Sequence, residues 1–586
     1  MKKNNICKKF LLLILVAISC FSFFSIPVNL VYAESLPSGL TQSELETQLD
    51  SFLQEKQSAT NAGVAIAVFN DTQDLYVKYQ GFANKENNIL VDSNTVFEWG
   101  SVTKLVVWVS AFQLAEQNKI DLNKDIKNYL PKNFLRKLKY DTPITMMNLM
   151  NHTAGFEEMI FNLEVYNENE IISLKDFLYK YQPNQVFKPG EVVAYSNWGA
   201  ALAGYIVEYV SGLPFYEYAQ QNIFKPLNML NTAINSNLSD NLAVKEKRKE
   251  NSSRNYDGTL IENSLAHIIP YPAGMCTSNL NDFSTFAKAL MNKDNRLLTT
   301  DSFDKLYTPS LYYTNTDKAR CCHGFWVQYF DNTTIIGHGG ATVGYKSELE
   351  FDLQNKIGMV VLSNITSSAY TSKVTEKVFG TYSQPVDYFN NSYKSTRNVF
   401  SGPLKIIFNL FANAKITSAI IKGYYINVLD DKLELDGTDY LVCGFGEAFL
   451  NIITIIWLVS NLYLLALLIN KLILKIKKKQ EKNPLKLLST IFCFGLLSPA
   501  LILIIFMETS LGDIFMKSIL ALKILTIVLF IYLICLIAFT VYYLIKTILT
   551  KNPSIWILLQ NIGLIVCSII TILIIILWDF AAFWLV

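Results

Sequence analysis

The stretch "EWGSVTKLVVWVSAFQLAEQ" (residues 98–117) predicts a helix that opens on Gly-Ser and then becomes almost wholly apolar. Lys104 follows Ser101 by three residues, and residues at that spacing lie on the same face of a helix, so the lysine can reach the serine. Burial among apolar side chains disfavours the ammonium form and lowers the pKa of a lysine. A neutral amine beside a hydroxyl activates that hydroxyl as a nucleophile. The stretch therefore predicts a reactive serine at the start of a buried helix.

The Ser-x-x-Lys pattern is weak when it stands alone. It occurs again in "SFDK" (residues 302–305), where nothing else in the sequence suggests chemistry. An isolated match of this kind is more often a surface helix than a reactive site. The interpretation of residues 98–117 therefore depends on other segments of the chain.

A second segment, "FKPGEVVAYSNWG" (residues 187–199), places Tyr195 and Asn197 on a loop before a predicted helix. A phenolate near a lysine can shuttle protons, because the neighbouring cation lowers the pKa of the phenol. The amide of Asn197 can hold a substrate carbonyl. Tyr-x-Asn is also weak by itself, since it recurs at 313–315, 388–390 and 425–427. An ordinary loop tyrosine remains the alternative.

A third segment, "IIGHGGATVGYKSELEF" (residues 335–351), contains His338 followed by two glycines after a short strand. Glycines at a strand edge let the backbone of a substrate approach closely and pair with it. The imidazole of His338 could polarise or protonate a group without carrying a permanent charge. A glycine turn with an incidental histidine is the alternative reading.

The surrounding sequence predicts strands at both ends of one domain and helices between them. Residues 62–70 and 75–84 resemble a hairpin, and four β-rich segments follow residue 324 with turn residues between them. We expect these strands to share one antiparallel sheet flanked by helices, with a largely helical subdomain over residues 157–235. The later β-rich segments are 325–330, 332–337, 345–352 and 357–364, and the clearest helices are 98–117, 144–156, 198–212 and 281–292.

The order Ser-x-x-Lys, Tyr-x-Asn, His-Gly-Gly resembles the penicillin-recognising serine hydrolases, and among them the branch of class C β-lactamases, D-aminopeptidases and serine D,D-carboxypeptidases. The resemblance covers about residues 60–380. It implies an α/β fold, an α+β sandwich of the serine β-lactamase type. It also implies that Ser101 is the acylated nucleophile, Lys104 its proton partner and Tyr195 the base in acylation and deacylation.

The same resemblance implies that Asn197 holds the substrate amide and that the backbone N–H groups of Ser101 and Ala341 form the oxyanion hole. Gly339 and Gly340 would line the substrate site. His338 stands where many relatives have lysine, in Lys-Thr-Gly. The chain thus lacks a fixed positive charge and a hydroxyl that help bind a free substrate carboxylate. This argues against β-lactamase or strict carboxypeptidase activity and favours peptides without a nearby C-terminus, D-aminoacyl compounds or esters.

The two ends of the chain predict membrane attachment. Residues 1–33 resemble a signal peptide, with an uncleaved anchor as the alternative, and both put the following domain outside the cytoplasm. Within residues 446–586, four apolar segments are each long enough to cross about 30 Å of hydrocarbon. The lysine-rich loop after the first belongs in the cytoplasm. The four segments are approximately 448–470, 487–507, 519–545 and 554–578.

We therefore expect an extracytoplasmic hydrolase domain (residues 34–380), a connector (residues 381–445) and a bundle of four transmembrane helices in the cell membrane. Within the connector, residues 403–421 predict either an amphipathic helix on the membrane surface or a packed linker helix. A secreted domain of this branch followed by membrane helices resembles the prodrug-activating D-peptidases. The implied substrate is a D-residue peptide, from the cell wall or from a natural product.

Composition narrows the other possibilities. The formal net charge of +2 argues against nucleic acid as the main partner. The four histidines show no metal-ligand spacing, so we expect no metal and no cofactor. Cys276, Cys321 and Cys322 of the outer domain are free thiols, or Cys276 pairs with one of the other two. The expected partners are membrane lipid and a membrane protein or a second copy, and the rival function is a β-lactam or cell-wall sensor that deacylates slowly.

Overall fold

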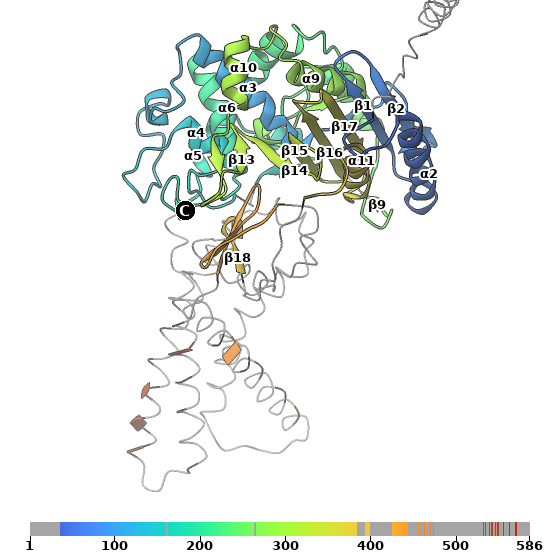
Figure 1. Cartoon of the computed structure of the whole chain (residues 1–586). Coiled ribbons are helices and arrows are strands. Elements are labelled where there is room, and N and C mark those ends of the chain that lie inside the picture. The colour runs from blue at the N-terminus through green and yellow to red at the C-terminus, as the bar shows by residue number, and fades with distance from the viewer. Residues whose placement is uncertain are drawn as a thin grey trace, which may run out of the picture.

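The computed structural model describes residues 35–159, 162–262, 265–383, 393–398 and 425–442, and scattered single positions beyond residue 450 (Figure 1). The predicted signal peptide, the predicted helix at 403–421 and most of the four predicted membrane spans lie outside these residues. Within the described residues, no helix combines the length and the apolar character that crossing a bilayer requires.

The central sheet has eight antiparallel strands in the order β12-β13-β14-β15-β16-β17-β1-β2. The first strand of the domain lies beside the last, as Val64 pairs with Ser363 and Asn70 with Ile357. The prediction that strands from both ends share one sheet is therefore confirmed. The strands are β1 (Val64–Asn70), β2 (Asp74–Gln80), β12 (Leu311–Tyr312), β13 (Ala319–Cys322), β14 (Phe325–Tyr329), β15 (Thr334–Thr342), β16 (Tyr345–Asp352) and β17 (Ile357–Ser363).

Both faces of this sheet are covered, which explains why β1 is apolar at nearly every position. Its alternate side chains enter two different cores: Ala65, Ala67 and Phe69 join the larger one, and Val64, Ile66 and Val68 join the smaller one. The smaller core lies under α2 (Gln42–Thr60) and α11 (Ala369–Phe379), and the larger lies under α9 (Leu280–Met291) and α3 (Thr103–Glu116).

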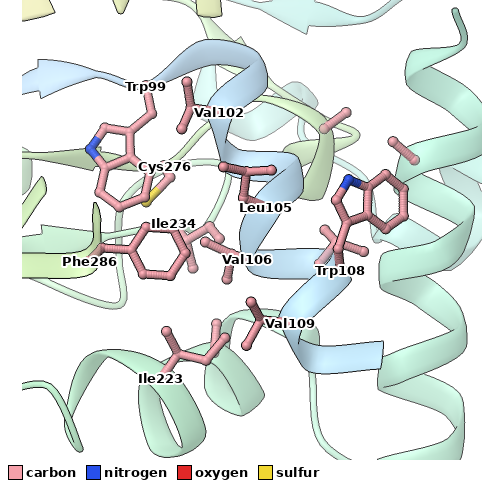
Figure 2. Close-up of a cluster of buried hydrophobic side chains, with 14 of the residues drawn as sticks. Trp99, Val102, Leu105, Val106, Trp108, Val109, Ile223, Ile234, Cys276 and Phe286 are labelled. Carbon is pink, nitrogen blue, oxygen red and sulfur yellow. The ribbon is translucent and has the colours of Figure 1, made fainter. Parts of the chain in front are cut away.

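Helix α3 runs through the larger core, and the side chains of residues 103–114 are all buried. Figure 2 shows Val106 and Val109 facing Ile234 and Ile223, while Trp108 extends from the opposite side of the helix. A helix that is apolar on all sides is an internal one. Burial of Lys104 thus follows from the position of the whole helix, as the opening stretch predicts.

The helical subdomain (157–235) and the segment before it contain fewer helical residues than the sequence predicts. The helix expected over 144–156 is α4 (Met146–Met150), and it ends early because His152 (φ +53°) and Gly155 (φ +81°) have left-handed backbone conformations. The expected end at Gly212 is confirmed, with φ +76° after the last residue of α6. The other helices here and beyond are α5 (Leu174–Lys180), α6 (Asn197–Ser211), α7 (Phe215–Ala219), α8 (Leu242–Glu250) and α10 (Thr300–Tyr307).

Short strands join the loops of the domain into small sheets. One sheet has the order β5-β11-β7, and three others pair β3 with β4, β6 with β10, and β8 with β9. Their bounds are β3 (Phe82–Asn84), β4 (Ile89–Leu90), β5 (Phe97–Glu98), β6 (Glu164–Val165), β7 (Thr232–Ala233), β8 (Ser253–Arg254), β9 (Leu260–Ile261), β10 (His267–Ile268) and β11 (Thr277–Ser278).

The region expected to be a connector contains folded structure. Its described residues, 393–398 and 425–442, form a four-stranded antiparallel sheet in the order β18-β21-β20-β19, with a small core that includes Tyr393 and Leu433. We call these residues the carboxy-terminal module; Figure 1 shows it beside the edge of the main domain that carries β13 and β14. Its elements are β18 (Tyr393–Ser395), the short helix η6 (Thr396–Asn398), β19 (Asn427–Val428), β20 (Lys432–Glu434) and β21 (Asp439–Val442).

Candidate active site

Ser101 and Lys104 lie at the start of the buried helix, in the 3₁₀ turn η1 (Gly100–Val102) and the first turn of α3. Lys104 Nζ is 2.9 Å from Ser101 Oγ, so the contact expected from their spacing is present. Two further groups surround the same nitrogen, Asn197 Oδ1 at 2.9 Å and the carbonyl oxygen of Ala273 at 2.6 Å. All three contacts of the amine are with uncharged groups.

The environment of Lys104 favours its neutral form. The side chain is completely buried, and burial lowers its pKa well below the ordinary value. Glu158 opposes this effect and Arg397 adds to it. A neutral amine can donate its two hydrogens to Asn197 and Ala273 and accept the proton of Ser101. The site therefore holds a base in contact with a hydroxyl.

Tyr195 lies beside this pair, with its ring centroid 4.9 Å from Lys104 Nζ and 4.1 Å from the stacked ring of His152. Its hydroxyl is buried and makes no hydrogen bond of ordinary geometry within the described residues, although Ser101 is close enough to lower its pKa. Burial is the larger effect, and the pKa of Tyr195 is raised well above 10. Arg397 does lower this pKa, but the expectation that the neighbouring lysine leaves Tyr195 with a lowered pKa is wrong, because desolvation of the phenolate is the larger effect.

Asn197 is the first residue of α6, and its backbone N–H donates to Glu158 Oε1 at 3.3 Å. His152, assigned from the sequence to a structural role, accepts a hydrogen bond at Nδ1 from the backbone N–H of Ser196 at 3.1 Å. Its pKa is lowered by burial and by Lys104, so the ring is neutral. The imidazole thus fixes the segment between Tyr195 and Asn197.

The His-Gly-Gly segment forms part of β15 and lies next to the tyrosine. The rings of His338 and Tyr195 are 6.2 Å apart between centroids. His338 Nδ1 is 2.6 Å from the carbonyl oxygen of Gly339, and Nε2 is buried without a partner within the described residues. Burial and the nearby Lys104 lower the pKa of His338 to about 3. This ring is therefore neutral and brings no positive charge to the site.

Two glycines allow β15 to approach the nucleophile turn. A Cβ at Gly340 would lie 1.9 Å from the carbonyl oxygen of Trp99, and a Cβ at Gly100, where φ is +53°, would lie 2.5 Å from the backbone nitrogen of Ala341. No side chain fits at either place. The backbones of Ser101 and Ala341 are thus brought to the same side of the site, where N–H groups of a first helical turn have no intrahelical partner.

Sequence reasoning missed two charged residues of the site, Glu158 and Arg397. Glu158 is buried, and together with Glu157 it interrupts a mostly apolar stretch ("AGFEEMIF", 154–161), which was a signal that could have been used. Arg397 donates from Nε to Glu158 Oε2 at 3.1 Å, and its guanidinium lies 5.0 Å from the centroid of the Tyr195 ring. No motif pointed to this arginine.

Among the described residues, the histidine, cysteine and carboxylate side chains form neither a metal site nor a disulfide. No group of three or more His, Cys, Asp or Glu side chains within them could hold a metal ion. Cys276, Cys321 and Cys322 are buried free thiols, which decides between the two alternatives that the sequence left open.

Comparison with known proteins gives a consistent set of relatives. The family model described as Beta-lactamase matches residues 49–378. A beta-lactamase of Pseudomonas fluorescens is 32% identical over 173 residues, covering 30% of this chain and 46% of that protein. A putative D-alanyl-D-alanine carboxypeptidase of Salmonella agona (strain SL483) is 26% identical over 205 residues, covering 32% of this chain and 47% of that protein. This chain thus spans less than half the length of either relative.

Among solved structures, the D-amino acid amidase of Ochrobactrum anthropi SV3 is similar over 57% of this chain and 97% of its own, with 20% identity and a TM-score of 0.48. The carboxy-terminal module begins after residue 378 and so lies beyond the match to the family model.

Proposed function

The chain belongs to the beta-lactamase family, and from that premise we propose that it is a serine hydrolase that cleaves an amide or ester bond through an acyl-enzyme on Ser101. One observation carries the proposal: a fully buried lysine amine with uncharged partners lies 2.9 Å from the serine hydroxyl. Such an amine can take the proton that the serine must lose when it attacks a carbonyl.

In the first half of the reaction, Ser101 Oγ forms a bond to the substrate carbonyl carbon and its proton passes to Lys104 Nζ. The developing oxyanion is held by the backbone N–H groups of Ser101 and Ala341. Tyr195 is protonated at rest, so its hydroxyl donates a proton to the leaving nitrogen or oxygen as the bond to carbon breaks. Lys104 then returns the proton taken from Ser101 to the phenolate. The products are the ester on Ser101 and a free amine or alcohol.

In the second half, a water molecule attacks the ester carbonyl and gives its proton to the neutral Lys104. The bond to Oγ breaks, Ser101 recovers a proton from Lys104, and a carboxylic acid leaves. Asn197 is suited to hold the substrate amide in both halves, because its side chain already contacts Lys104. His338 is suited to accept a hydrogen bond from the substrate at its unpartnered Nε2.

The proposed substrate is a peptide or related amide with a D-residue at the scissile bond, from the cell wall or from a natural product. The name of the Salmonella relative, a putative D-alanyl-D-alanine carboxypeptidase, supports a substrate with a D-residue. The neutral His338 supports substrates without a free carboxylate beside the His-Gly-Gly segment. The leader-like residues 1–33 and the apolar segments after residue 446 support attachment to the cell membrane with the catalytic domain outside.

Incubating the purified full-length protein with a panel of substrates tests this proposal. The panel contains D-Ala-D-Ala peptides, acyl-D-Asn amides, D-aminoacyl amides, short esters and nitrocefin. We expect steady release of product from at least one D-residue amide and none from the Ser101→Ala variant. Full turnover by that variant would overturn the mechanism. Stable labelling of Ser101 without turnover would indicate the sensor in place of the enzyme.

A further inference from the structure

The carboxy-terminal module is tied to the segment that carries Tyr195. Val193 donates its N–H to Asp439 Oδ2 at 3.0 Å, and its carbonyl oxygen accepts from the Asp439 N–H at 2.9 Å and from Thr396 Oγ1 at 2.5 Å. The next residue, Ala194, pairs with Thr438 in an antiparallel bridge. The module therefore pairs with the segment that carries Tyr195 in the way that a neighbouring strand of a sheet would.

Buried polar contacts secure the same module to the central sheet. Arg320 of β13 forms a fully buried ion pair with Asp439 at 2.7 Å and donates to the carbonyl oxygen of Asp436 at 3.0 Å. Glu434 accepts hydrogen bonds from the N–H and hydroxyl of Thr314. Burial opposes ionisation of Glu434, but hydrogen bonds from Lys432 and Thr314 lower its pKa to about 2. These buried contacts give the module a defined position on the domain.

Arg397 extends from the module into the site, one residue after the Thr396 that binds Val193. It contacts Glu158, whose other oxygen accepts from the backbone of Asn197, and Asn197 in turn contacts Lys104. The Tyr195 ring thus has two basic groups near it, Lys104 Nζ at 4.9 Å and the Arg397 guanidinium at 5.0 Å.

We infer that the carboxy-terminal module is a working part of the active site, in which Arg397 cancels the charge of Glu158 beside Lys104 and so keeps the lysine amine available as a base. The inference rests on the proposed function, and it assigns Arg397 a positioning role outside the region matched by the family. Without the arginine, the buried Glu158 carboxylate would favour the ammonium form of Lys104. Direct effects on Lys104 agree, since Glu158 raises its pKa and Arg397 lowers it.

The other groups that face Lys104 do not supply this balance. His152 lies just beyond the end of α4 and His338 lies on β15, and burial keeps both rings neutral. Tyr195 is protonated, since burial raises its pKa. Asn197 and Ala273 contribute uncharged oxygen atoms. Among the described groups, Glu158 and Arg397 therefore provide the formal charges that act on the lysine.

The test measures the rate at which a fluorescent fluorophosphonate phosphonylates Ser101 of the full-length protein, with release of fluoride, from about pH 5 to pH 10. In the wild type we expect the rate to rise with pH as Lys104 loses its proton. Arg397→Gln should move this rise to higher pH by roughly one unit, which makes labelling about tenfold slower on the rise and unchanged on the plateau. Glu158→Gln should move it to lower pH, and the double variant should lie between the two.

Two control variants separate charge from structure. Arg397→Lys keeps the charge and should restore the wild-type profile, and Arg296→Gln removes an arginine from a surface ion pair with Asp294 and should change nothing. A uniform loss of rate with an unmoved profile in Arg397→Gln, or no change at all, would overturn the inference and leave the proposed function standing. Failure of the probe to label wild-type Ser101 would overturn both.

Discussion

The Ser-x-x-Lys pattern occurs at 101–104 and at 302–305, and the structure gives the two copies opposite environments. Lys104 is fully buried, contacts uncharged groups and has a lowered pKa. Lys305 lies on the exposed face of α10, pairs with Asp301 at 2.7 Å and has a raised pKa because of that hydrogen bond. Both serines precede their lysines by the same three residues. The three-residue spacing therefore lets a lysine reach a serine. The burial and the neighbouring charges of the lysine determine whether its amine can act as a base.

The largest difference between the copies should appear when each serine loses its hydroxyl. Ser101→Ala removes the proposed nucleophile and should lower kcat by at least about 10⁴-fold. Ser302→Ala should leave kcat within about twofold, because α10 contributes nothing to the site. Steady-state turnover of the best amide in the panel measures both. Similar losses of kcat in the two variants would show that Ser101 is no more important for turnover than Ser302.

Replacing the two lysines should produce almost as large a difference in kcat. Lys104→Met keeps the volume of the side chain and removes the base, which should lower kcat about 10³-fold. Lys305→Met breaks an exposed ion pair and should leave turnover unchanged. Circular dichroism on both variants checks that the fold is intact. An active Lys104→Met protein would mean that another group takes the proton of Ser101.

Carboxylates in a buried and in an exposed ion pair should also differ in how much they contribute to stability. Asp439→Asn removes the carboxylate that pairs with the buried Arg320 and should lower the free energy of unfolding by about 3 kcal/mol. Asp301→Asn on the surface should cost less than about 0.5 kcal/mol. Urea denaturation followed by tryptophan fluorescence measures both, because Trp326 packs near Gly437 of the module. Equal losses of unfolding free energy in the two variants would contradict the buried contact between the module and the main domain.

The smallest effect is expected at His338. Because its pKa is lowered to about 3, the ring is neutral from pH 5 upward and should add no step to the pH profile in that range. His338→Gln removes one hydrogen-bond acceptor and should lower kcat/KM by about tenfold at every pH. The disappearance of a step near neutral pH in this variant would show that the imidazole titrates there.

Local patterns predicted much of this structure. The apolar or alternating sequences of strands β1 and β14 to β17 predict the sheet. Helical spacing alone predicts the contact between Lys104 and Ser101. The end of α6 at Gly212 also follows from a local rule, since glycine adopts the left-handed conformation easily. In each case, the decisive residues lie within a few positions of one another.

The remaining features depend on contacts between distant segments. Glu158 and Arg397 are 239 residues apart, and no local pattern links them. The module escaped notice because its strands are two to four residues long, too short for a clear alternation. The pKa of Tyr195 was predicted in the wrong direction because a neighbouring cation could be foreseen, whereas burial of the phenol hydroxyl could not.

A direct titration of Lys104 is the most decisive measurement for this site. Protein labelled with ¹³C at the lysine ε-carbons reports the charge of each amine, and the Lys104→Met variant identifies the resonance. We predict a titration midpoint well below the ordinary value of about 10.4, with Arg397→Gln moving it upward. A midpoint at or above that value would contradict the proposal that a neutral amine activates Ser101.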